Sequence, residues 1–377
     1  MYSRILNPPS KKSFFLFGPR GTGKTTWLKI KFPNAVYLDL LDAEIFNDLV
    51  ARPERIERFI PPSFNNFVII DEVQRIPELL NEAHRLIEQK KYNFILTGSS
   101  ARKLRGKGVN LLAGRALTYN LYPLTATELG KDFSIEHALR FGHLPATFNE
   151  SNKKKYLESY VMTYLEQEVR QEGLTRNIGS FSRFLEIASF SQGSITNVSQ
   201  IARDCGINRK VAENYFSILY DLMIAYRLPF FAKRAKRKAI QHEKFYFFDT
   251  GIYQTIRPRG PLDTTEEIGG TALETLVFQE LKAFNDYLGL DYQLSFWKSP
   301  QGHEVDFILY GKRGIKAIEV KRTSIISEKH FRGLKAFTQT YPLAKSYLLY
   351  GGERKMWEGN IQIIPVVQFL KNMRDYI

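Results

Sequence analysis

One segment near the N-terminus constrains the fold of this chain more than any other feature. Residues 18–25 match the pattern G-x-x-x-x-G-K-[ST] and directly follow the apolar run 13–17. Glycines tolerate backbone dihedrals that other residues avoid, so this turn can direct its N–H groups at phosphates, beside the positive end of the following helix. The segment therefore predicts a strand, a phosphate-binding loop and a helix that hold a nucleoside triphosphate. The predicted contacts are Gly18, Pro19, Arg20, Gly21, Thr22, Gly23, Lys24, Thr25 and Thr26.

A second motif supplies carboxylates to the same site. The apolar run 67–70 ends in Asp71 and Glu72. We predict that Lys24 reaches the outer phosphates, that Thr25 and Asp71 hold Mg²⁺, and that Glu72 polarises the attacking water. A further apolar run, 92–96, leads to a group of hydroxyl side chains, in which Ser99 is the predicted γ-phosphate sensor. The expected cofactors are ATP and Mg²⁺.

With these motifs, residues 1 to about 130 resemble the AAA-type P-loop ATPases that carry an additional catalytic glutamate. The resemblance implies that the sensor strand lies between the P-loop strand and the Asp71 strand. The side chains of Asp71, Glu72 and Ser99 would then converge on the nucleotide.

The next residues resemble a subgroup of bacterial and archaeal ATPases with a long C-terminal region. Leu112-Ala113-Gly114-Arg115 precedes Tyr122-Pro123-Leu124-Thr125 and Glu128, as in that subgroup. The resemblance makes Arg115 a candidate γ-phosphate sensor or arginine finger. An ordinary surface arginine is the alternative, since Arg102 and Arg105 lie close by in the sequence.

Composition limits the classes of protein and partner. With 377 residues, 44% of them hydrophobic, the chain is long enough for two or three domains. No apolar run approaches the roughly 20 residues of a membrane helix, and the single Cys205 fits a reducing compartment, so we expect a cytoplasmic protein without a membrane partner. A net charge of +15, from 54 basic and 39 acidic residues, favours DNA as partner, although basic residues can also serve solubility.

The pattern along the chain predicts four regions. Apolar segments at 35–40, 67–70 and 93–97 alternate with helical stretches and indicate a parallel α/β sheet. The predicted regions are a P-loop ATPase domain at 1–130, a helical linker or lid at 131–193, a winged helix-turn-helix at 194–255 and a nuclease-like α/β domain at 265–377.

Residues 194–248 resemble a winged helix-turn-helix. A short helix is expected before the turn 205–207, and Asn208 is expected to cap the second helix. Two strand-like runs, 224–231 and 245–248, enclose a basic stretch that resembles the wing. The predicted DNA contacts are Arg209, Lys210 and Asn214 on the second helix, and Lys233, Arg234, Lys236, Arg237 and Lys238 in the wing, with Lys244 in the same basic set. A packing module with a solvated basic loop is the alternative.

A third constellation lies near the C-terminus. Asp306 and the segment Glu319-Val320-Lys321 resemble the PD-(D/E)xK nuclease motif with the spacing of its Holliday-junction-resolvase-like branch. Strand alternation places Glu319 and Lys321 on one face. The resemblance implies Mg²⁺ on Asp306 and Glu319, an orienting Lys321 and an upstream helical glutamate, which Glu274 matches. A nuclease-like scaffold with internal salt bridges is the alternative.

Two functions from different classes fit these features. The first is an oligomeric, ATP-driven DNA-processing motor that acts on branched or structured DNA. The second is an ATP-gated regulatory or defence switch whose C-terminal domains only bind DNA or protein. DNA-stimulated, processive ATP hydrolysis would distinguish the motor from the switch.

Overall fold

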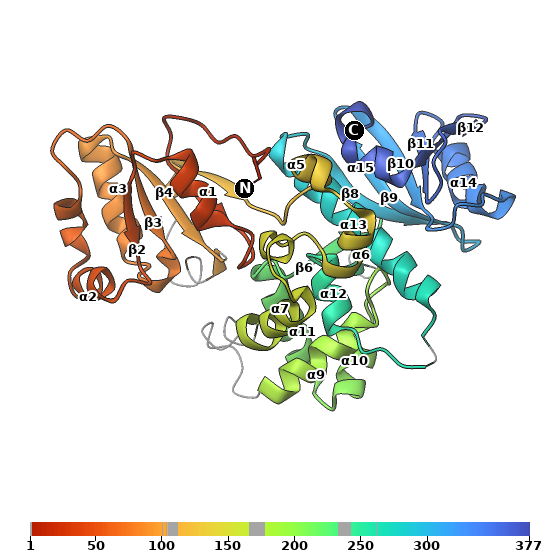
Figure 1. The fold of residues 1–377 in the computed structure, drawn as a ribbon, viewed down its shortest axis with the longest axis horizontal. Coiled ribbons are helices and arrows are strands. Elements are labelled where there is room, and N and C mark those ends of the chain that lie inside the picture. The colour runs from red at the N-terminus through yellow and green to blue at the C-terminus, as the bar shows by residue number, and fades with distance from the viewer. Residues whose placement is uncertain are drawn as a thin grey trace. The chain divides into compact units, whose positions relative to one another are not determined.

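The computed structural model describes residues 2–99, 101–102, 104, 112–165, 178–232, 243–261 and 263–377. The chain divides into two compact units, which are described separately (Figure 1). The N-terminal unit comprises Arg4–Tyr122 and Asp221–Met223, and the C-terminal unit comprises Met1–Ser3, Pro123–Tyr220 and Ile224–Ile377.

The N-terminal unit is built on a five-stranded sheet. The strand order is β2-β3-β4-β1-β5, and all neighbouring strands are parallel. This confirms the predicted parallel α/β fold, with β4 between the P-loop strand β1 and the Asp71 strand β3. The strands are β1 (Phe14–Phe17), β2 (Val36–Asp39), β3 (Phe67–Asp71), β4 (Asn93–Gly98) and β5 (Leu117–Asn120). The helices are α1 (Lys24–Lys31), α2 (Ala43–Ala51) and α3 (Leu79–Lys90), with the short 3₁₀ segments η1 (Pro53–Phe59), η2 (Val73–Arg75) and η3 (Leu112–Gly114).

Continuous apolar runs place the central strands inside this unit. Every residue of β1 and β3 is buried, as expected for parallel strands that are covered on both faces. On one face, Phe15, Val68 and Leu96 share a core cluster with Leu49 of α2 and Leu80 of α3. Because parallel strands end at the same edge, this packing brings the polar residues after β1, β3 and β4 together.

The C-terminal unit begins with short helices. The predicted helical linker or lid, 131–193, lies in this part, and its residues 166–177 lie outside the described part of the chain. The elements here are α5 (Ala126–Leu129), η4 (Gly130–Asp132), α6 (Ile135–Phe141), η5 (Pro145–Phe148), α7 (Lys153–Ser159), the π-helical η6 (Tyr160–Leu165) and α9 (Ile178–Ser189).

A helix-turn-helix and a two-stranded sheet follow. Helix α10 (Val198–Cys205) ends at Gly206, whose φ of 69° supplies the left-handed conformation that closes a helix. The Asn208 side chain accepts from the Val211 N–H at 2.9 Å and caps α11 (Arg209–Asp221), as the sequence predicts. Strands β6 (Ala225–Pro229) and β7 (Glu243–Phe247) pair antiparallel.

The last part of the C-terminal unit is a mixed six-stranded sheet of order β12-β13-β11-β10-β9-β8. Phe337 belongs to a core cluster that includes Trp297 and Val305, while Phe278 stacks on Tyr246 and Phe307. This packing joins β7 to the sheet through α13. The strands are β8 (Gln293–Lys298), β9 (Glu304–Gly311), β10 (Gly314–Val320), β11 (Lys345–Tyr350), β12 (Met356–Glu358) and β13 (Ile361–Pro365). The helical segments are α12 (Thr250–Ile256), α13 (Thr265–Tyr287), η8 (Glu328–Phe331), α14 (Arg332–Thr340), α15 (Val366–Lys371) and η9 (Met373–Asp375).

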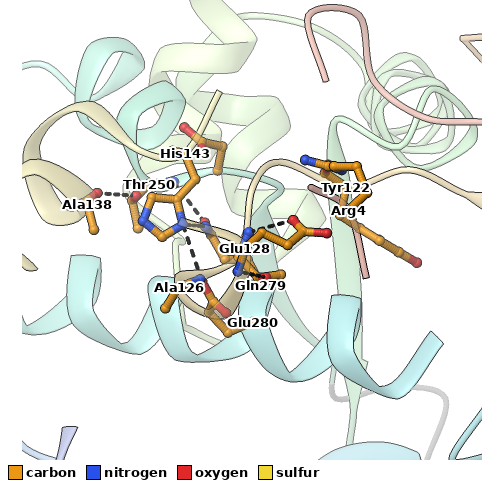
Figure 2. Close-up of polar contacts among 11 residues, drawn as sticks. Arg4, Tyr122, Ala126, Glu128, Ala138, His143, Thr250, Gln279 and Glu280 are labelled. Carbon is orange, nitrogen blue, oxygen red and sulfur yellow. Dashed lines mark hydrogen bonds and ion pairs between the residues drawn. The ribbon is translucent and has the colours of Figure 1, made fainter. Parts of the chain in front are cut away.

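A buried polar network ties the first helices of this unit to α13 (Figure 2). Thr125 and Glu128 form a capping box at the start of α5, and the Ala126 N–H donates to Glu280 Oε1 at 2.8 Å. His143 Nδ1 lies 3.3 Å from the same oxygen, and both side chains are almost fully buried. Burial raises the pKa of Glu280, and its hydrogen bond to His143 opposes that rise. The Thr125 and Glu128 positions of the sequence pattern therefore anchor the start of this unit.

Candidate functional site

The loop after β1 has the backbone that phosphate binding requires. Gly21 and Gly23 have φ values of 80° and 89°, in the left-handed region that glycine tolerates best. At Gly18, a Cβ atom would lie only 2.3 Å from the Leu121 carbonyl oxygen, so a larger residue would clash with the backbone. Helix α1 begins after Gly23 with no side-chain cap and no acidic residue in its first turn. Its N-terminal dipole and amides thus fit an anionic ligand.

The side chains of the loop converge on the same space. The Lys24 ammonium is buried and donates to the carbonyl oxygens of Gly18 at 2.7 Å and Pro19 at 3.2 Å. Thr22 Oγ1 donates to the Pro19 carbonyl at 2.9 Å and closes the turn. Of the other predicted contacts, Arg20 is half-buried and Thr26 is exposed.

Asp71 is the centre of the metal side of the site. Its buried carboxylate accepts from Thr25 Oγ1 at 2.7 Å, and the hydroxyls of Thr97 and Tyr37 contact its two oxygens. Burial and the hydrogen bond to Asp71 raise the pKa of Tyr37, so its phenol stays protonated and donates. A carboxylate and a hydroxyl beside a phosphate loop are oxygen donors of the kind that Mg²⁺ prefers, so these residues fit the Mg²⁺–ATP complex.

Glu72 has an unusual backbone conformation at the end of β3. Its φ of 61° lies in the left-handed region, which costs a non-glycine residue about 1–3 kcal/mol. The Glu72 N–H donates to Thr97 Oγ1 at 3.3 Å, and Gln74 Nε2 donates to Glu72 Oε2 at 2.5 Å. Such strain at a strand end is common at functional sites. The Glu72 carboxylate is therefore held by Gln74, directly after Asp71 in the chain.

Sequence reasoning did not assign the three side chains that support these carboxylates. Tyr37 reaches Asp71 from β2, Thr97 reaches it from β4, and Gln74 holds Glu72 from the following turn. The first two contacts depend on the order of strands in the sheet. The sequence offers one indication for Thr97, because this residue belongs to the run of hydroxyl-bearing residues that includes Ser99.

The two predicted sensors lie in different surroundings. Ser99 follows β4 and is 4% exposed, and within the described residues its Oγ has no hydrogen-bond partner. Arg115 lies on the surface of the N-terminal unit, and its guanidinium pairs with Glu88 of α3. The Ser99 hydroxyl is therefore buried two residues after Thr97, which contacts Asp71, whereas the Arg115 side chain pairs with Glu88.

Replacing Thr97 by valine tests the support of Asp71. Valine keeps the shape of threonine but removes the hydroxyl that contacts Asp71 and Glu72. We expect the Mg²⁺ concentration for half-maximal ATP hydrolysis to rise about 10- to 100-fold, as for other partners of metal ligands. Thr97→Ser keeps the hydroxyl and is expected to restore the normal Mg²⁺ dependence. An unchanged Mg²⁺ dependence in Thr97→Val would assign the hydroxyl a purely structural role.

The predicted DNA contacts are only partly within the described residues. Arg209, Lys210 and Asn214 are exposed on α11, and Arg209 pairs with Glu213 at 2.7 Å. The wing residues Lys233, Arg234, Lys236, Arg237 and Lys238 lie outside the described part of the chain. Lys244 was assigned to the same exposed basic set, and this was wrong: it is 3% exposed.

The C-terminal carboxylates gather where α13, β9 and β10 meet β7. Lys244 Nζ lies 3.2 Å from Glu274 Oε1 and 2.7 Å from Glu304 Oε1, and Tyr246 also contacts Glu274. The Val320 N–H donates to Asp306 Oδ2 at 2.8 Å. Lys321 pairs with Glu319 Oε1 at 2.5 Å, and Lys298 with Glu304 Oε2 at 3.4 Å. The group Glu274, Glu304, Asp306 and Glu319 is called the carboxylate cluster below.

Burial and ion pairing set the charge states of this cluster. Burial and the charge of Asp306 raise the pKa of Glu319 to about 8, while Lys321 opposes the rise. Burial and the charge of Asp306 also raise the pKa of Glu274. Burial would raise the pKa of Glu304, but the charges of Lys244 and Lys298 lower it overall. Pairs of groups with displaced pKa values are typical of functional sites, although structural ion-pair networks show them too.

The cluster does not present a ready metal site. Among the described residues, no group of three or more His, Cys, Asp or Glu side chains is placed to hold a metal ion. Lysine ammonium groups lie against Glu274, Glu304 and Glu319. Lys321 pairs with Glu319 Oε1, whereas the buried Glu319 Oε2 has no hydrogen-bond partner among the described residues, and the Mg²⁺ site on Asp306 and Glu319 stays a prediction.

Family comparisons match three consecutive parts of the chain. Residues 10–130, which include the P-loop, Asp71, Glu72 and Arg115, match the AAA domain. The N-terminal unit is an AAA-type P-loop ATPase domain. Residues 132–263 and 269–369 match two families described as domains of unknown function, DUF8612 and DUF4143. The AAA match implies ATP as the cofactor of the first unit.

Two relatives that match most of the chain are described as uncharacterized proteins. The chain is 26% identical over 369 residues to a protein of Mycobacterium tuberculosis, with 94% of this chain and 80% of that protein covered. It is 24% identical over 331 residues to a protein of Methanocaldococcus jannaschii, and this match covers 79% of this chain and 72% of that protein. The similarity spans both units of this chain in the first case.

Two solved structures show weak similarity. The Aeropyrum pernix ORC1 protein in complex with DNA has 13% identity and a TM-score of 0.25, with 66% of this chain and 87% of that chain covered. A STAND signal-transduction ATPase from Pyrococcus horikoshii has 16% identity and a TM-score of 0.20, and the match covers 75% of this chain and 46% of that chain. TM-scores of this size do not establish a shared fold.

Over the described residues, no helix has both the length and the apolar composition needed to cross a membrane.

Proposed function

We propose that this protein couples ATP hydrolysis to DNA binding and works as an oligomeric DNA-processing motor on branched or structured DNA. The observation that carries the ATPase part is the convergence of Lys24, Thr25 and Asp71 at the loop after β1. Glu72 follows Asp71 directly, and its N–H donates to Thr97 Oγ1. When bound, Mg²⁺ neutralises the charge of the phosphates. Lys24 binds the outer phosphates, and Glu72 orients water for attack on the γ-phosphate.

DNA binding is supported by charge and by an exposed helix face. The net charge of +15 provides the excess of cations that phosphate neutralisation uses. On α11, Arg209, Lys210 and Asn214 are exposed after the turn of a helix-turn-helix, the place from which recognition helices contact DNA. The Arg209–Glu213 pair is exposed, so exchanging Glu213 for a phosphate costs little.

The proposed oligomer rests on Arg115. Its guanidinium is paired with Glu88, and its side chain is 38% exposed. We infer that it exchanges Glu88 for the nucleotide of a neighbouring copy. An arginine supplied in trans stabilises the charge of phosphoryl transfer. We therefore expect mixed oligomers of unmodified and Arg115→Ala chains to lose part of their ATPase activity.

The test of this function is ATP turnover with a panel of DNAs. Duplex, single-stranded, forked and four-way-junction DNAs are added at equal nucleotide concentration, with and without Mg²⁺, and phosphate release is measured. We expect several-fold stimulation by the preferred DNA, only when Mg²⁺ is present. If no DNA binds and none changes turnover, the coupling to DNA is rejected.

The second candidate is an ATP-gated switch in which the C-terminal domains only bind. The ion pairs of Lys244 with Glu274 and Glu304 and of Lys321 with Glu319 favour it, since structural ion-pair networks can also gather carboxylates in one place. A switch hydrolyses about one ATP per binding event, whereas a motor shows sustained turnover on DNA. Endonuclease activity stays a prediction of the sequence.

The Arg209→Ala/Lys210→Ala double variant tests the helix face. Each cation that contacts a phosphate contributes about 0.9 to the slope of log affinity against log salt concentration. We expect binding to weaken for every sequence and the slope to fall by up to about two. The matched control is Lys154→Ala/Lys155→Ala, which removes the same charge from the exposed face of α7. Equal slopes in the two variants would place the DNA contact elsewhere.

A further inference from the structure

Lys244 lies in a place where a lysine is rarely found. It belongs to β7, yet its side chain is 3% exposed, and its ammonium lies above the Phe296 ring, 5.4 Å from the ring centroid. An ammonium group loses much solvation energy on burial and stays in such a place only when it is well paired. The environment of Lys244 must therefore supply several negative charges.

The carboxylate cluster supplies those charges from two elements of the nuclease-like part. Lys244 Nζ lies 3.2 Å from Glu274 Oε1 of α13 and 2.7 Å from Glu304 Oε1 of β9. Both distances are those of direct, charge-assisted hydrogen bonds. A single positive charge thus bridges two carboxylates that come from different elements, as a bound metal ion often does.

The other two carboxylates of the cluster, Asp306 and Glu319, also contact donors of the chain. Asp306 accepts from the Val320 backbone N–H, and Glu319 is paired with Lys321. As noted above, the described residues contain no group of three potential ligands placed to hold a metal ion. Ammonium and amide groups of the chain thus contact all four carboxylates, although Glu319 Oε2 has no hydrogen-bond partner among the described residues.

We propose that Lys244 is a built-in counter-cation that takes the place of a divalent metal in the carboxylate cluster. The ammonium neutralises Glu274 and Glu304 and ties β7 to α13 and β9. As a result, this part of the protein folds without a divalent metal ion beside Glu274 and Glu304. The proposal concerns only the C-terminal unit and is independent of ATP hydrolysis by the N-terminal unit.

The proposal predicts an additional divalent-metal site in the C-terminal unit of the variant and none there in the unmodified protein. Removing the ammonium in Lys244→Ala leaves the cluster with unbalanced negative charge and a space beside Glu274 and Glu304. A small divalent cation can then neutralise the same carboxylates. We expect Lys244→Ala to bind one more Mn²⁺ per chain than the unmodified protein and to bind Mn²⁺ at least about tenfold more tightly, measured by calorimetry with the full chain.

Thermal unfolding gives an independent readout. In EDTA, Lys244→Ala is expected to unfold at a lower temperature than the unmodified protein, because the carboxylates repel one another. Added Mn²⁺ or Mg²⁺ is expected to raise its unfolding temperature by several degrees, while the same addition changes the unmodified protein by less than about one degree. Adding Glu274→Gln to Lys244→Ala is expected to abolish the gain, because Glu274 is one of the two carboxylates that contact Lys244.

Two further variants keep the test decisive. Lys298→Ala removes a more exposed cation from the same Glu304 and is expected to gain no Mn²⁺ site. Lys244→Met keeps the volume of the side chain over Phe296, and it is assayed in the same way if Lys244→Ala does not fold in EDTA. Recovery of folded protein only with Mn²⁺ also supports the proposal. Metal-independent behaviour of both Lys244 variants overturns it, as does Mn²⁺ binding by the unmodified protein that Asp306→Asn abolishes.

Discussion

Replacing Lys24 by alanine is expected to reduce the rate of ATP hydrolysis by roughly a thousandfold. The Lys24 ammonium is buried at the loop and is directed by the carbonyl oxygens of Gly18 and Pro19. In phosphoryl transfer, charge accumulates on the outer phosphate oxygens, and a fixed cation stabilises it without having to reorganise. Alanine removes that charge and also weakens binding of the triphosphate. Phosphate release at saturating Mg²⁺–ATP measures the loss.

The control for Lys24→Ala is Lys31→Ala. Lys31 is exposed in the last turn of the same helix, so its replacement changes the net charge equally without touching the phosphate loop. We expect its turnover to stay within about twofold of normal. If Lys24→Ala also keeps its turnover within tenfold, the loop after β1 is not the site of hydrolysis.

Replacing Glu72 by glutamine is expected to stop hydrolysis while ATP binding persists. Glutamine has nearly the shape of glutamate and can still pair with Gln74, so the Asp71 side of the site stays intact. It cannot polarise water as a carboxylate does, and we expect turnover to fall by about a hundredfold or more. The protein should retain ATP rather than ADP after gel filtration. This retention distinguishes Glu72→Gln from Lys24→Ala, which should lose the nucleotide.

Glu78→Gln serves as the matched control for Glu72→Gln. Glu78 lies exposed just before α3, and the same chemical change there is expected to leave hydrolysis unaltered. Normal turnover in Glu72→Gln would assign water activation to another group. A partial loss in Gln74→Ala would show that the hydrogen bond from Gln74 orients Glu72.

Much of the N-terminal unit could be predicted from local sequence. The apolar runs 67–70 and 93–97 became β3 and β4 with shifts of about one residue, because continuous apolar residues bounded by polar ones suit a strand that is covered on both faces. Asp71 and Glu72 were identifiable because they end such a run. Tyr37 was not, since its contact with Asp71 depends on β2 and β3 pairing in a register that places Tyr37 opposite Ile69.

The surroundings of the charged residues in the C-terminal unit could not be predicted from local sequence. Lys244 stands next to a basic stretch in the sequence, which favoured an exposed position, yet it is buried against Glu274 and Glu304. Lysine burial depends on whether carboxylates from other elements reach the same place. No local pattern around residue 244 carries that information.

By itself, the sequence determined the phosphate loop, the metal-side carboxylate and the parallel strands that position them. These features depend on glycine conformation, apolar periodicity and neighbouring residues, all of which are local. Only the tertiary structure decided which side chains support Asp71, where Arg115 is paired, and that Lys244 lies within the carboxylate cluster. The physical reason is that the energy of a buried charge is set by partners brought close through packing, not by its neighbours along the chain.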